Sequence, residues 1–174
     1  MVESMTVFNR TAVRHHRDRA ATNLSAHDFL FTESAERLAD RLDDVTRYFP
    51  LALDLGCHGG ELARALGGRG GIETLIQSDL SPILAALANG KGTPALAGDE
   101  EALPFAEMSF DLVLSNLNLH WVNDLPGMLI QIRRVLKPDG MFLAAALGGD
   151  TLHELRTSLF QAETETEGGV SPRF

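Results

Sequence analysis

Cysteine is scarce in this sequence, and its single thiol, Cys57, can form neither an internal disulfide nor a zinc cluster built from several cysteines. No apolar run approaches the length of a bilayer span; the longest, residues 141–147, has the length of a buried strand. The amino terminus lacks the apolar segment of a secretory signal peptide. Since one cysteine also fits a reducing compartment, we expect a cytoplasmic protein without a membrane span.

Positive charge is also in short supply. The 15 Lys and Arg residues against 24 Asp and Glu residues give a formal net charge of −9, which argues against a nucleic-acid-binding protein. The first 20 residues hold an unusual share of the basic side chains, namely Arg10, Arg14, Arg17 and Arg19. We interpret this segment as a solvated basic arm; the alternative is a flap over an anionic ligand. Mitochondrial transit peptides are also Arg-rich, but Glu3 and Asp18 interrupt this segment, so we favour the cytoplasm.

Alternation of strands and helices is the main structural signal. The chain has 174 residues and is 44% hydrophobic, enough for one domain with a core. Helical spacing predicts a helix over 33–49, ended by Pro50. Beyond it we predict strands at 51–55, 72–78, 94–97, 110–115 and 141–147, helices at 61–66, 81–89, 124–136 and 150–165, and a turn at 137–140. This order predicts a parallel, doubly wound α/β sheet over 51–174, preceded by an arm and helix over 1–50.

A glycine-bearing turn at residues 54–60 follows the first predicted strand and opens a helix. Glycine lets the backbone turn tightly and approach a ligand with no Cβ in the way. The amino terminus of the helix then offers N–H groups to a carboxylate or phosphate. A plain strand-to-helix turn is the alternative, since many such turns contain several glycines.

Acidic residues follow the next two strands. Asp79 lies about 20 residues after the glycine turn, where an acid can accept both ribose hydroxyls of an adenosine; its alternative role is to cap the helix at Ser81. Asp99 can accept a hydrogen bond from an adenine amino group, with the next backbone N–H serving a ring nitrogen; the alternative is a solvated acidic loop. All three motifs lie at carboxyl ends of strands, where such sheets bind ligands.

The order and spacing of these motifs resemble class I S-adenosylmethionine-dependent methyltransferases. The resemblance rests on residues 54–57, Asp79, 99–105, 110–113 and 136–140. It implies a Rossmann-like fold, S-adenosylmethionine as cofactor and methyl transfer as the leading activity. Such domains usually continue to a sixth and a seventh strand, which we expect to be lacking here. The chain would then be a fragment, or a second copy would complete the sheet edge in a homodimer.

The resemblance also implies roles for individual residues. Those expected to bind the cofactor are Asp54, Gly56, Cys57, His58, Gly60, Asp79, Leu80, Asp99, Glu100, Ser115 and Asn116. Of these, the glycine turn would hold the methionine end, and Ser115 and Asn116 would lie beside the sulfonium. Arg10 would reach the cofactor carboxylate from the arm. His58 replaces the family's usual middle glycine, so its ring must point away from the cofactor or the turn must shift, which bears on affinity.

Four further segments, 8–10, 49–57, 119–126 and 148–156, look like the complex I assembly factor five family. Related malonyl-acyl carrier protein O-methyltransferases share the segment 120–122. The eukaryotic members of the assembly factor family are mitochondrial and are described as arginine hydroxylases acting on a complex I subunit. This closer resemblance implies two alternatives to methyl transfer, hydroxylation of a protein arginine and a non-catalytic scaffold, with a complex I subunit as partner. It leaves the acceptor open between a small molecule and a protein.

The sequence offers one candidate for a general base, His120, which follows the fourth predicted strand. We favour the alternative that its ring packs on Trp121. The histidines are scattered over different elements and no pair has helical ligand spacing, so we predict no metal site. An NAD-binding Rossmann protein is a further alternative, disfavoured by the loop at 99–105 and the turn at 136–140.

Overall fold

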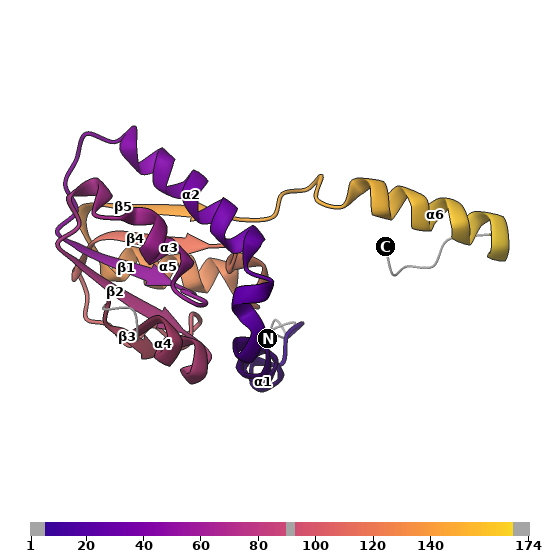
Figure 1. Cartoon of the computed structure of the whole chain (residues 1–174), viewed down its shortest axis with the longest axis horizontal. Coiled ribbons are helices and arrows are strands. Elements are labelled where there is room, and N and C mark those ends of the chain that lie inside the picture. The colour runs from indigo at the N-terminus through magenta and orange to yellow at the C-terminus, as the bar shows by residue number, and fades with distance from the viewer. Residues whose placement is uncertain (1–5, 90–92, 169–174) are drawn as a thin grey trace.

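A parallel sheet forms the centre of the computed structural model, which describes residues 6–89 and 93–168. Its five strands are β1 (Leu51–Leu55), β2 (Thr74–Asp79), β3 (Ala95–Ala97), β4 (Phe110–Asn116) and β5 (Leu136–Ala145). They lie in the order β3-β2-β1-β4-β5 with every neighbouring pair parallel (Figure 1). This confirms the predicted doubly wound α/β fold. The chain order reverses between β1 and β4, and open sheets bind ligands beyond the strand ends at such a reversal.

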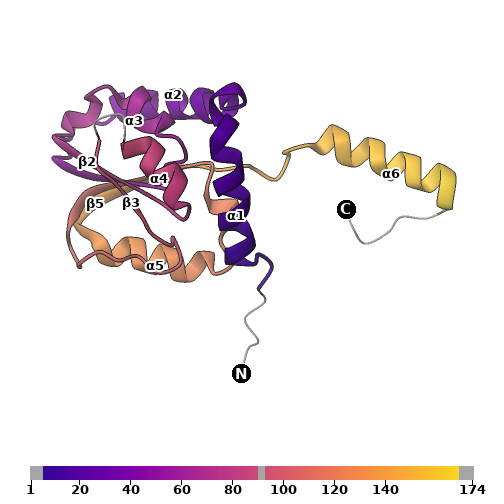
Figure 2. The ribbon, with the colours of Figure 1, turned by 60° about the horizontal axis from the view of Figure 1, so that its bottom comes forward.

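Helices cover both faces of the sheet, as Figure 2 shows. On one face lie α2 (Phe29–Asp43) and α3 (Glu61–Leu66), and on the other α5 (Leu125–Val135); α4 (Pro82–Asn89) packs against β2 and β3. Strand residues alternate between two cores: Ala52 of β1 faces the α2 side, whereas Leu53 and Leu55 face the α5 side. Because both faces are buried, the central strands are almost continuously apolar.

The helix α1 (Arg10–Ala20) crosses the edge of the sheet at which the strands end (Figure 2). It begins at Asn9, whose side chain accepts a hydrogen bond from the backbone N–H of Ala12 at 3.1 Å. Only Val13 and Arg17 of this helix are buried. A 3₁₀ segment, η1 (Ala21–Ala26), connects it to α2. The amino-terminal arm is therefore ordered and lies over the ends of the strands.

The predicted helix at 33–49 is wrong over residues 44–49. The helix α2 ends at Asp43, and the chain from Val45 to Phe49 is not helical. Phe49 is nevertheless buried in the same core as Leu38 and Leu42, and its backbone N–H donates to the Gly70 carbonyl at 2.9 Å. The apolar residues Val45 and Phe49 follow α2 at helical spacing because the chain after α2 folds back onto the core that α2 covers.

The predicted turn at 137–140 is also wrong, because these residues belong to β5, which begins at Leu136. The backbone of Asp139 is left-handed, with φ of 61°, and the pairing of β4 with β5 shifts register between Phe110 and Leu112. The turn-like sequence therefore makes an irregularity within the strand.

The last helix, α6 (His153–Glu167), extends away from the sheet and its helices (Figures 1 and 2). None of its residues is buried, and Leu155, Leu159 and Phe160 are exposed. Over residues 6–89 and 93–168, the chain has no helix that is both long enough and apolar enough to cross a membrane.

Candidate functional site

Asp54 is the residue before the last one in β1 and is completely buried. Neither of its carboxyl oxygens has a hydrogen-bond partner among the residues that the structure describes. Burial, with the negative charges of Glu61 and Asp79, raises the pKa of Asp54 to about 8. A buried acid without partners is costly in an apolar core, which makes Asp54 a candidate to bind a polar group from outside the chain.

The glycine turn approaches the strand ends closely. Gly56 and Gly60 have left-handed backbones, with φ of 78° and 80°. The N–H groups of Gly56 and Cys57 donate to the Ser78 carbonyl at 2.8 and 3.0 Å, which fastens the turn to β2. Burial raises the pKa of the Cys57 thiol, so Cys57 is a packing residue of the turn.

His58 fills space within this turn rather than pointing to solvent. Its ring stacks on Phe31 with centroids 4.2 Å apart, and its Nε2 lies 3.0 Å from the carbonyl oxygen of Asn116. Burial lowers the pKa of His58, so the ring is neutral and Nε2–H is the donor to that carbonyl. The backbone is left-handed at φ of 48°, a conformation that glycine adopts with less strain. The imidazole therefore occupies one backbone acceptor at the carboxyl end of β4.

Asp79 ends β2 and is completely buried. One carboxyl oxygen accepts from Arg17 Nη1 at 3.2 Å and from the Ser81 N–H at 2.8 Å, and the other accepts from the His58 N–H at 3.1 Å. Ser81 in turn caps α4, since its Oγ accepts from the Leu84 N–H at 3.1 Å. Asp79 thus supports the start of α4 while it faces the strand ends, with the half-buried Leu80 beside it. The capping and ligand-binding interpretations of Asp79 are compatible.

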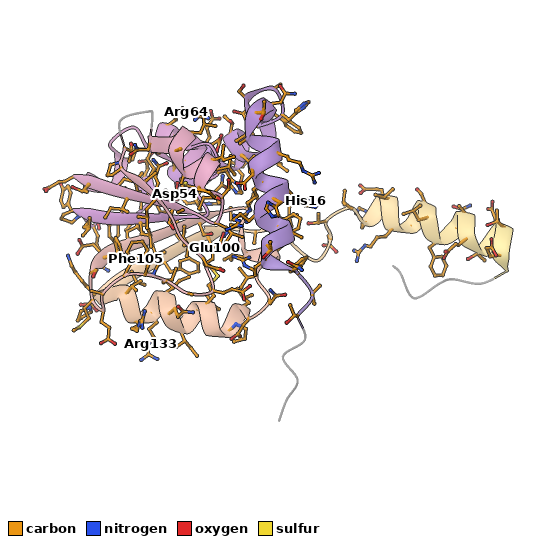
Figure 3. All side chains as sticks on the ribbon, turned by 90° about the horizontal axis from the view of Figure 1, so that it is seen from below. His16, Asp54, Arg64, Glu100, Phe105 and Arg133 are labelled. Atoms are coloured by element: carbon orange, nitrogen blue, oxygen red, sulfur yellow. The ribbon has the colours of Figure 1, made fainter. Side chains whose placement is uncertain are left out.

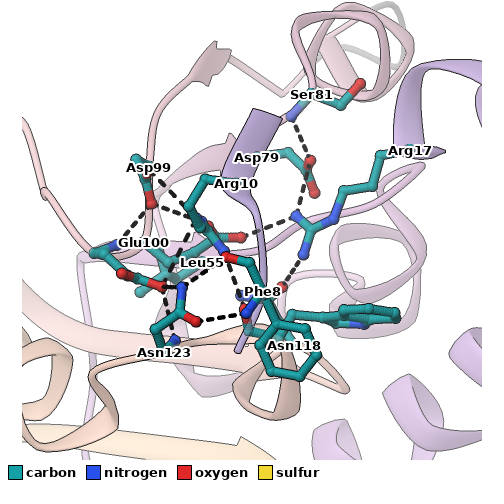
Figure 4. A network of polar contacts seen from close by, with 12 residues as sticks. Phe8, Arg10, Arg17, Leu55, Asp79, Ser81, Asp99, Glu100, Asn118 and Asn123 are labelled. Carbon is teal, nitrogen blue, oxygen red and sulfur yellow. Dashed lines mark hydrogen bonds and ion pairs between the residues drawn. The ribbon is translucent and has the colours of Figure 1, made fainter. Parts of the chain in front are cut away.

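Two guanidinium groups of the amino-terminal arm reach the acidic residues, as Figure 4 shows. Arg17 Nη1 lies 2.9 Å from Glu100 Oε1, and Arg10 Nη2 lies 2.6 Å from Asp99 Oδ1 and also bonds the second oxygen of Glu100. Burial by itself raises the pKa of Glu100, but the charges of Arg17 and Arg10 outweigh it and hold that pKa below its usual value. The expectation of a solvated arm is therefore wrong for these two arginines. Arg10 also lies at Asp99, the expected adenine side, rather than at the methionine end.

The end of β4 supplies further polar groups. Ser115 Oγ donates to the Leu55 carbonyl at 2.9 Å, and Asn116 Nδ2 donates to the Phe31 carbonyl at 2.9 Å. Asn118 accepts from Arg17 Nη2 at 2.6 Å. Asn116 Oδ1 and Asn118 Nδ2 are buried without a partner in the described part of the chain. Sequence reasoning missed Asn118 and Phe31 altogether, because neither belongs to a motif; Arg17 was signalled only by the flap interpretation.

An apolar cavity of about 400 Å³ lies between α1 and the strand ends. Phe31, His58, Arg17 and Trp121 contribute to its wall, so it adjoins the polar groups already described. Figure 3 shows Asp54 and Glu100 on this side of the sheet, near α1 with His16, whereas Arg133 projects from the far side of α5. His120 is exposed, and its ring lies 5.5 Å from that of Trp121 in a tilted arrangement. Although the side chain is exposed overall, the part of the ring that faces the protein is desolvated, and this effect, together with the positive charge of Arg17, lowers the pKa of His120, so the ring is available as a neutral base.

Comparison with known proteins agrees with this geometry. Residues 53–144 match the family model described as a methyltransferase domain. Among solved structures, one chain of the complex that contains the Haloferax volcanii Trm112 methyltransferase activator superposes with a TM-score of 0.70. That match is 28% identical and covers 77% of this chain and 60% of the other.

Two curated relatives resemble nearly the whole chain. The mitochondrial protein of Danio rerio named arginine-hydroxylase NDUFAF5 is 49% identical over 99% of this chain and 54% of its own length. The malonyl-[acyl-carrier protein] O-methyltransferase of Methylovorus sp. is 34% identical over 94% of this chain and 59% of its own length. The chain thus spans little more than half the length of these relatives. The mitochondrial name of the first contradicts the cytoplasmic location expected from the sequence.

Proposed function

Because the chain belongs to the methyltransferase domain family, we propose that it binds S-adenosylmethionine at the carboxyl ends of β1, β2 and β3 and directs methyl transfer to an acceptor. S-adenosylmethionine is the cofactor that this family implies. One observation carries the proposal: acids that end or follow three different strands, Asp54, Asp79 and Asp99, converge with the glycine turn on one edge of the sheet. This is where a doubly wound sheet binds its ligand.

Buried polar atoms without partners support the fit of the cofactor. Within the described residues these include both oxygens of Asp54, Asn116 Oδ1 and Asn118 Nδ2, all near the strand ends. Natural proteins rarely leave such groups unpaired, because each one costs about 1–3 kcal/mol. A ligand with an amino acid portion, ribose hydroxyls and an adenine offers donors and acceptors for them. The left-handed glycines add a backbone surface without Cβ atoms.

Each residue of the site has a distinct task in this proposal. Asp54, with the turn that contains Gly56, Cys57, His58 and Gly60, holds the methionine end. Asp79 accepts the ribose hydroxyls beside Leu80, and Asp99 with the Glu100 backbone takes the adenine. Ser115 and Asn116, at the end of β4, border the reacting centre. The cofactor would therefore contact Asp54, Gly56, Cys57, His58, Gly60, Asp79, Leu80, Asp99, Glu100, Ser115 and Asn116.

S-adenosylmethionine supplies an activated methyl group on a positively charged sulfur. The chain's own contribution is to hold the acceptor in line with that group and to keep water out, and alignment alone can lower a barrier by several kcal/mol. The apolar cavity beside His58 and Trp121 gives the acceptor a place next to the site. His120, neutral at pH 7, borders Trp121 and is the candidate to take a proton from the acceptor.

The test is transfer of a labelled methyl group. Purified chain and S-adenosylmethionine labelled at the methyl carbon are incubated with a mitochondrial protein extract and, separately, with its small-molecule fraction. With the cofactor below saturation, we expect label in one fraction, and much less of it with Asp79→Asn. Asp44 is exposed and directly follows the end of α2, so Asp44→Asn should act as wild type. Label that appears equally with wild type and Asp79→Asn contradicts the proposal.

A second candidate function is favoured by the 49% identity to the protein named arginine-hydroxylase NDUFAF5. We propose on this basis a mitochondrial location and, as the alternative reaction, hydroxylation of an arginine in a complex I subunit, in which O2 gives one oxygen atom to the product and a reductant outside this chain supplies two electrons to convert the other to water. Intact-mass spectrometry of the modified product separates the two reactions, because methylation adds a CH₂ unit and hydroxylation adds an oxygen atom. An added oxygen that requires this chain would replace methyl transfer as the activity.

A further inference from the structure

Two side chains of α1 hold the same carboxylates that the proposed function gives to the cofactor. Arg17 bonds Asp79 and Glu100, and Arg10 bonds Asp99 and Glu100 (Figure 4). The arginines therefore sit where ribose hydroxyls and an adenine amino group are expected. A guanidinium donates hydrogen bonds to carboxylate oxygens, as ribose hydroxyls and an adenine amino group also do, so it can take their place.

The carboxylate of Asp79 cannot bond fully to Arg17 and to a ribose hydroxyl at the same time. Its Oδ2 is used by the His58 N–H, and its Oδ1 by the Ser81 N–H and by Arg17. Both backbone donors belong to the fold itself, since they fix the glycine turn and the start of α4. Of these three donors from the described residues, Arg17 alone is a side chain that can leave. A ribose hydroxyl that bonds Oδ1 must compete with it.

Glu100 bonds both arginines. The contacts of Arg10 and Arg17 with Asp79, Asp99 and Glu100 are called the clasp below. Glu100 is completely buried, with one oxygen on Arg17 and the other on Arg10. Arg17 gains a third anchor in Asn118, at 2.6 Å. Charge-assisted hydrogen bonds of this kind are about twice as strong as neutral ones, so the clasp fixes α1 firmly when no ligand competes.

Apart from this clasp, α1 is lightly attached. Val13 is its only buried apolar residue. Further polar contacts hold it: Asp18 accepts from Ser81 Oγ at 2.5 Å, Arg10 Nη1 donates to the Trp121 carbonyl at 3.1 Å, and just before α1 the Phe8 backbone bonds the Asn123 side chain. The following segment η1 contains no buried residue and has a non-helical backbone at Asn23. Because so little apolar surface fixes α1, its docked position depends mainly on the arginine contacts.

We propose that α1 is a lid whose arginines occupy the cofactor carboxylates in the ligand-free protein, so that adenosine binding and the docked position of Arg17 exclude each other. This inference rests on the proposed function. Cofactor binding then requires the release of Arg17 from Asp79 and Glu100. The observed affinity therefore equals the intrinsic affinity multiplied by the fraction of molecules in which the lid is open.

The test uses 5′-methylthioadenosine, which carries the ribose and adenine but no amino acid portion, beside S-adenosylhomocysteine. Both are titrated calorimetrically into wild type, Arg17→Gln, Arg17→Lys and Arg14→Gln. Arg14 is an exposed arginine of the same helix, so its variant controls for charge and helix propensity. Arg17→Lys keeps the positive charge beside the buried acids but loses the forked contact with Asn118, and it carries the test if Arg17→Gln does not fold.

We expect Arg17→Gln to bind 5′-methylthioadenosine about tenfold more tightly than wild type, Arg17→Lys to lie between them and Arg14→Gln to match wild type. Amide hydrogen exchange over residues 10–20 of the wild type should become faster on saturation with 5′-methylthioadenosine. If both Arg17 variants bind the two ligands no more tightly than wild type, the lid is overturned while the cofactor site stands. If no protein of the series binds either ligand, the proposed function and the lid both fail.

Discussion

The Asn118 side chain lies directly against Gly56. A Cβ added to Gly56 would fall 2.3 Å from Asn118 Cγ, and the backbone of Gly56 is left-handed at φ of 78°. Asn118 in turn holds Arg17, so this contact links the glycine turn on β1 to the arm through the end of β4. Glycine is required here for a close approach between two elements and not only for a tight turn.

Gly56→Ala should therefore destabilise the protein by about 2–5 kcal/mol, because the left-handed backbone and the clash with Asn118 both contribute. Gly68→Ala is the matched control: its φ is 88° but a Cβ there meets nothing within 4 Å, so only the backbone cost of about 1–2 kcal/mol applies. Urea unfolding of the two variants measures the difference. Equal losses of stability would mean that the Asn118 contact is unimportant.

His58→Gly should raise the affinity for S-adenosylhomocysteine about tenfold while it lowers stability by about 1–3 kcal/mol. The substitution relieves a left-handed backbone and frees the Asn116 carbonyl, but it removes a buried ring that stacks on Phe31. Calorimetry and urea unfolding give the two quantities. Met108→Gly, at an exposed position with φ of 49°, should leave affinity unchanged. Weaker binding by His58→Gly would show that the imidazole supports the site.

The protonation of Asp54 should make the stability of the folded protein depend on pH. Its folded pKa is raised from 3.8 to about 8, because burial and the charges of Glu61 and Asp79 disfavour the carboxylate. The folded chain then binds a proton that the unfolded chain has lost, so stability is fully present below about pH 4 and declines as the pH rises through about 8. The slope is at most about 1.4 kcal/mol per pH unit.

Asp54→Asn removes this titration and should flatten the decline between those pH values. Denaturant midpoints of wild type and variant, followed across that range, make the comparison. The ion-paired Glu100 has a lowered pKa and so acts with the opposite sign, at more acidic pH, where it does not obscure the effect. An unchanged decline in Asp54→Asn would mean that Asp54 is ionised or paired in solution.

Asp111 joins three strands, and its two contacts can be separated by mutation. Lys137 Nζ lies 2.9 Å from both carboxyl oxygens, and the Leu51 N–H donates to one of them at 3.0 Å. Lys137→Met removes only a partly exposed ion pair and should cost about 0.5 kcal/mol. Asp111→Ala also leaves the Leu51 N–H unpaired and should cost about 1–3 kcal/mol. Thermal unfolding that ranks the two variants in the reverse order would contradict this account.

Sequence reasoning predicted the parallel sheet because its signal is local. Apolar strands, the glycine turn and the helix start at Ser81 each depend on a few neighbouring residues, and the strands at 51–55 and 110–115 lie within one residue of β1 and β4. The helix at 33–49 was overextended because Val45 and Phe49 pack into the core of α2 without being helical. Periodicity reports burial, and burial does not reveal how the chain reaches the core.

The contacts of the arm lay beyond sequence reasoning for a different reason. Arg17 is separated from Glu100 by 83 residues and from Asn118 by 101, so no local pattern connects them. A basic segment beside an acidic loop is compatible with a solvated arm, a flap or an ion-paired lid. Only the path of α1 across the strand ends decides among these, and that path is set by tertiary packing.

The central claim is that the acids at the strand ends hold an adenosine-containing cofactor, and calorimetric titration of S-adenosylhomocysteine into wild type and Asp79→Asn tests it most directly. Arg17 keeps Glu100 and Asn118 as partners in the variant, so α1 should stay docked. We predict micromolar binding by wild type and about 10- to 100-fold weaker binding by Asp79→Asn, since hydrogen bonds to a charged group contribute about 1.5–3 kcal/mol. Absence of binding by the wild type, or equal affinity in the two proteins, would contradict the account.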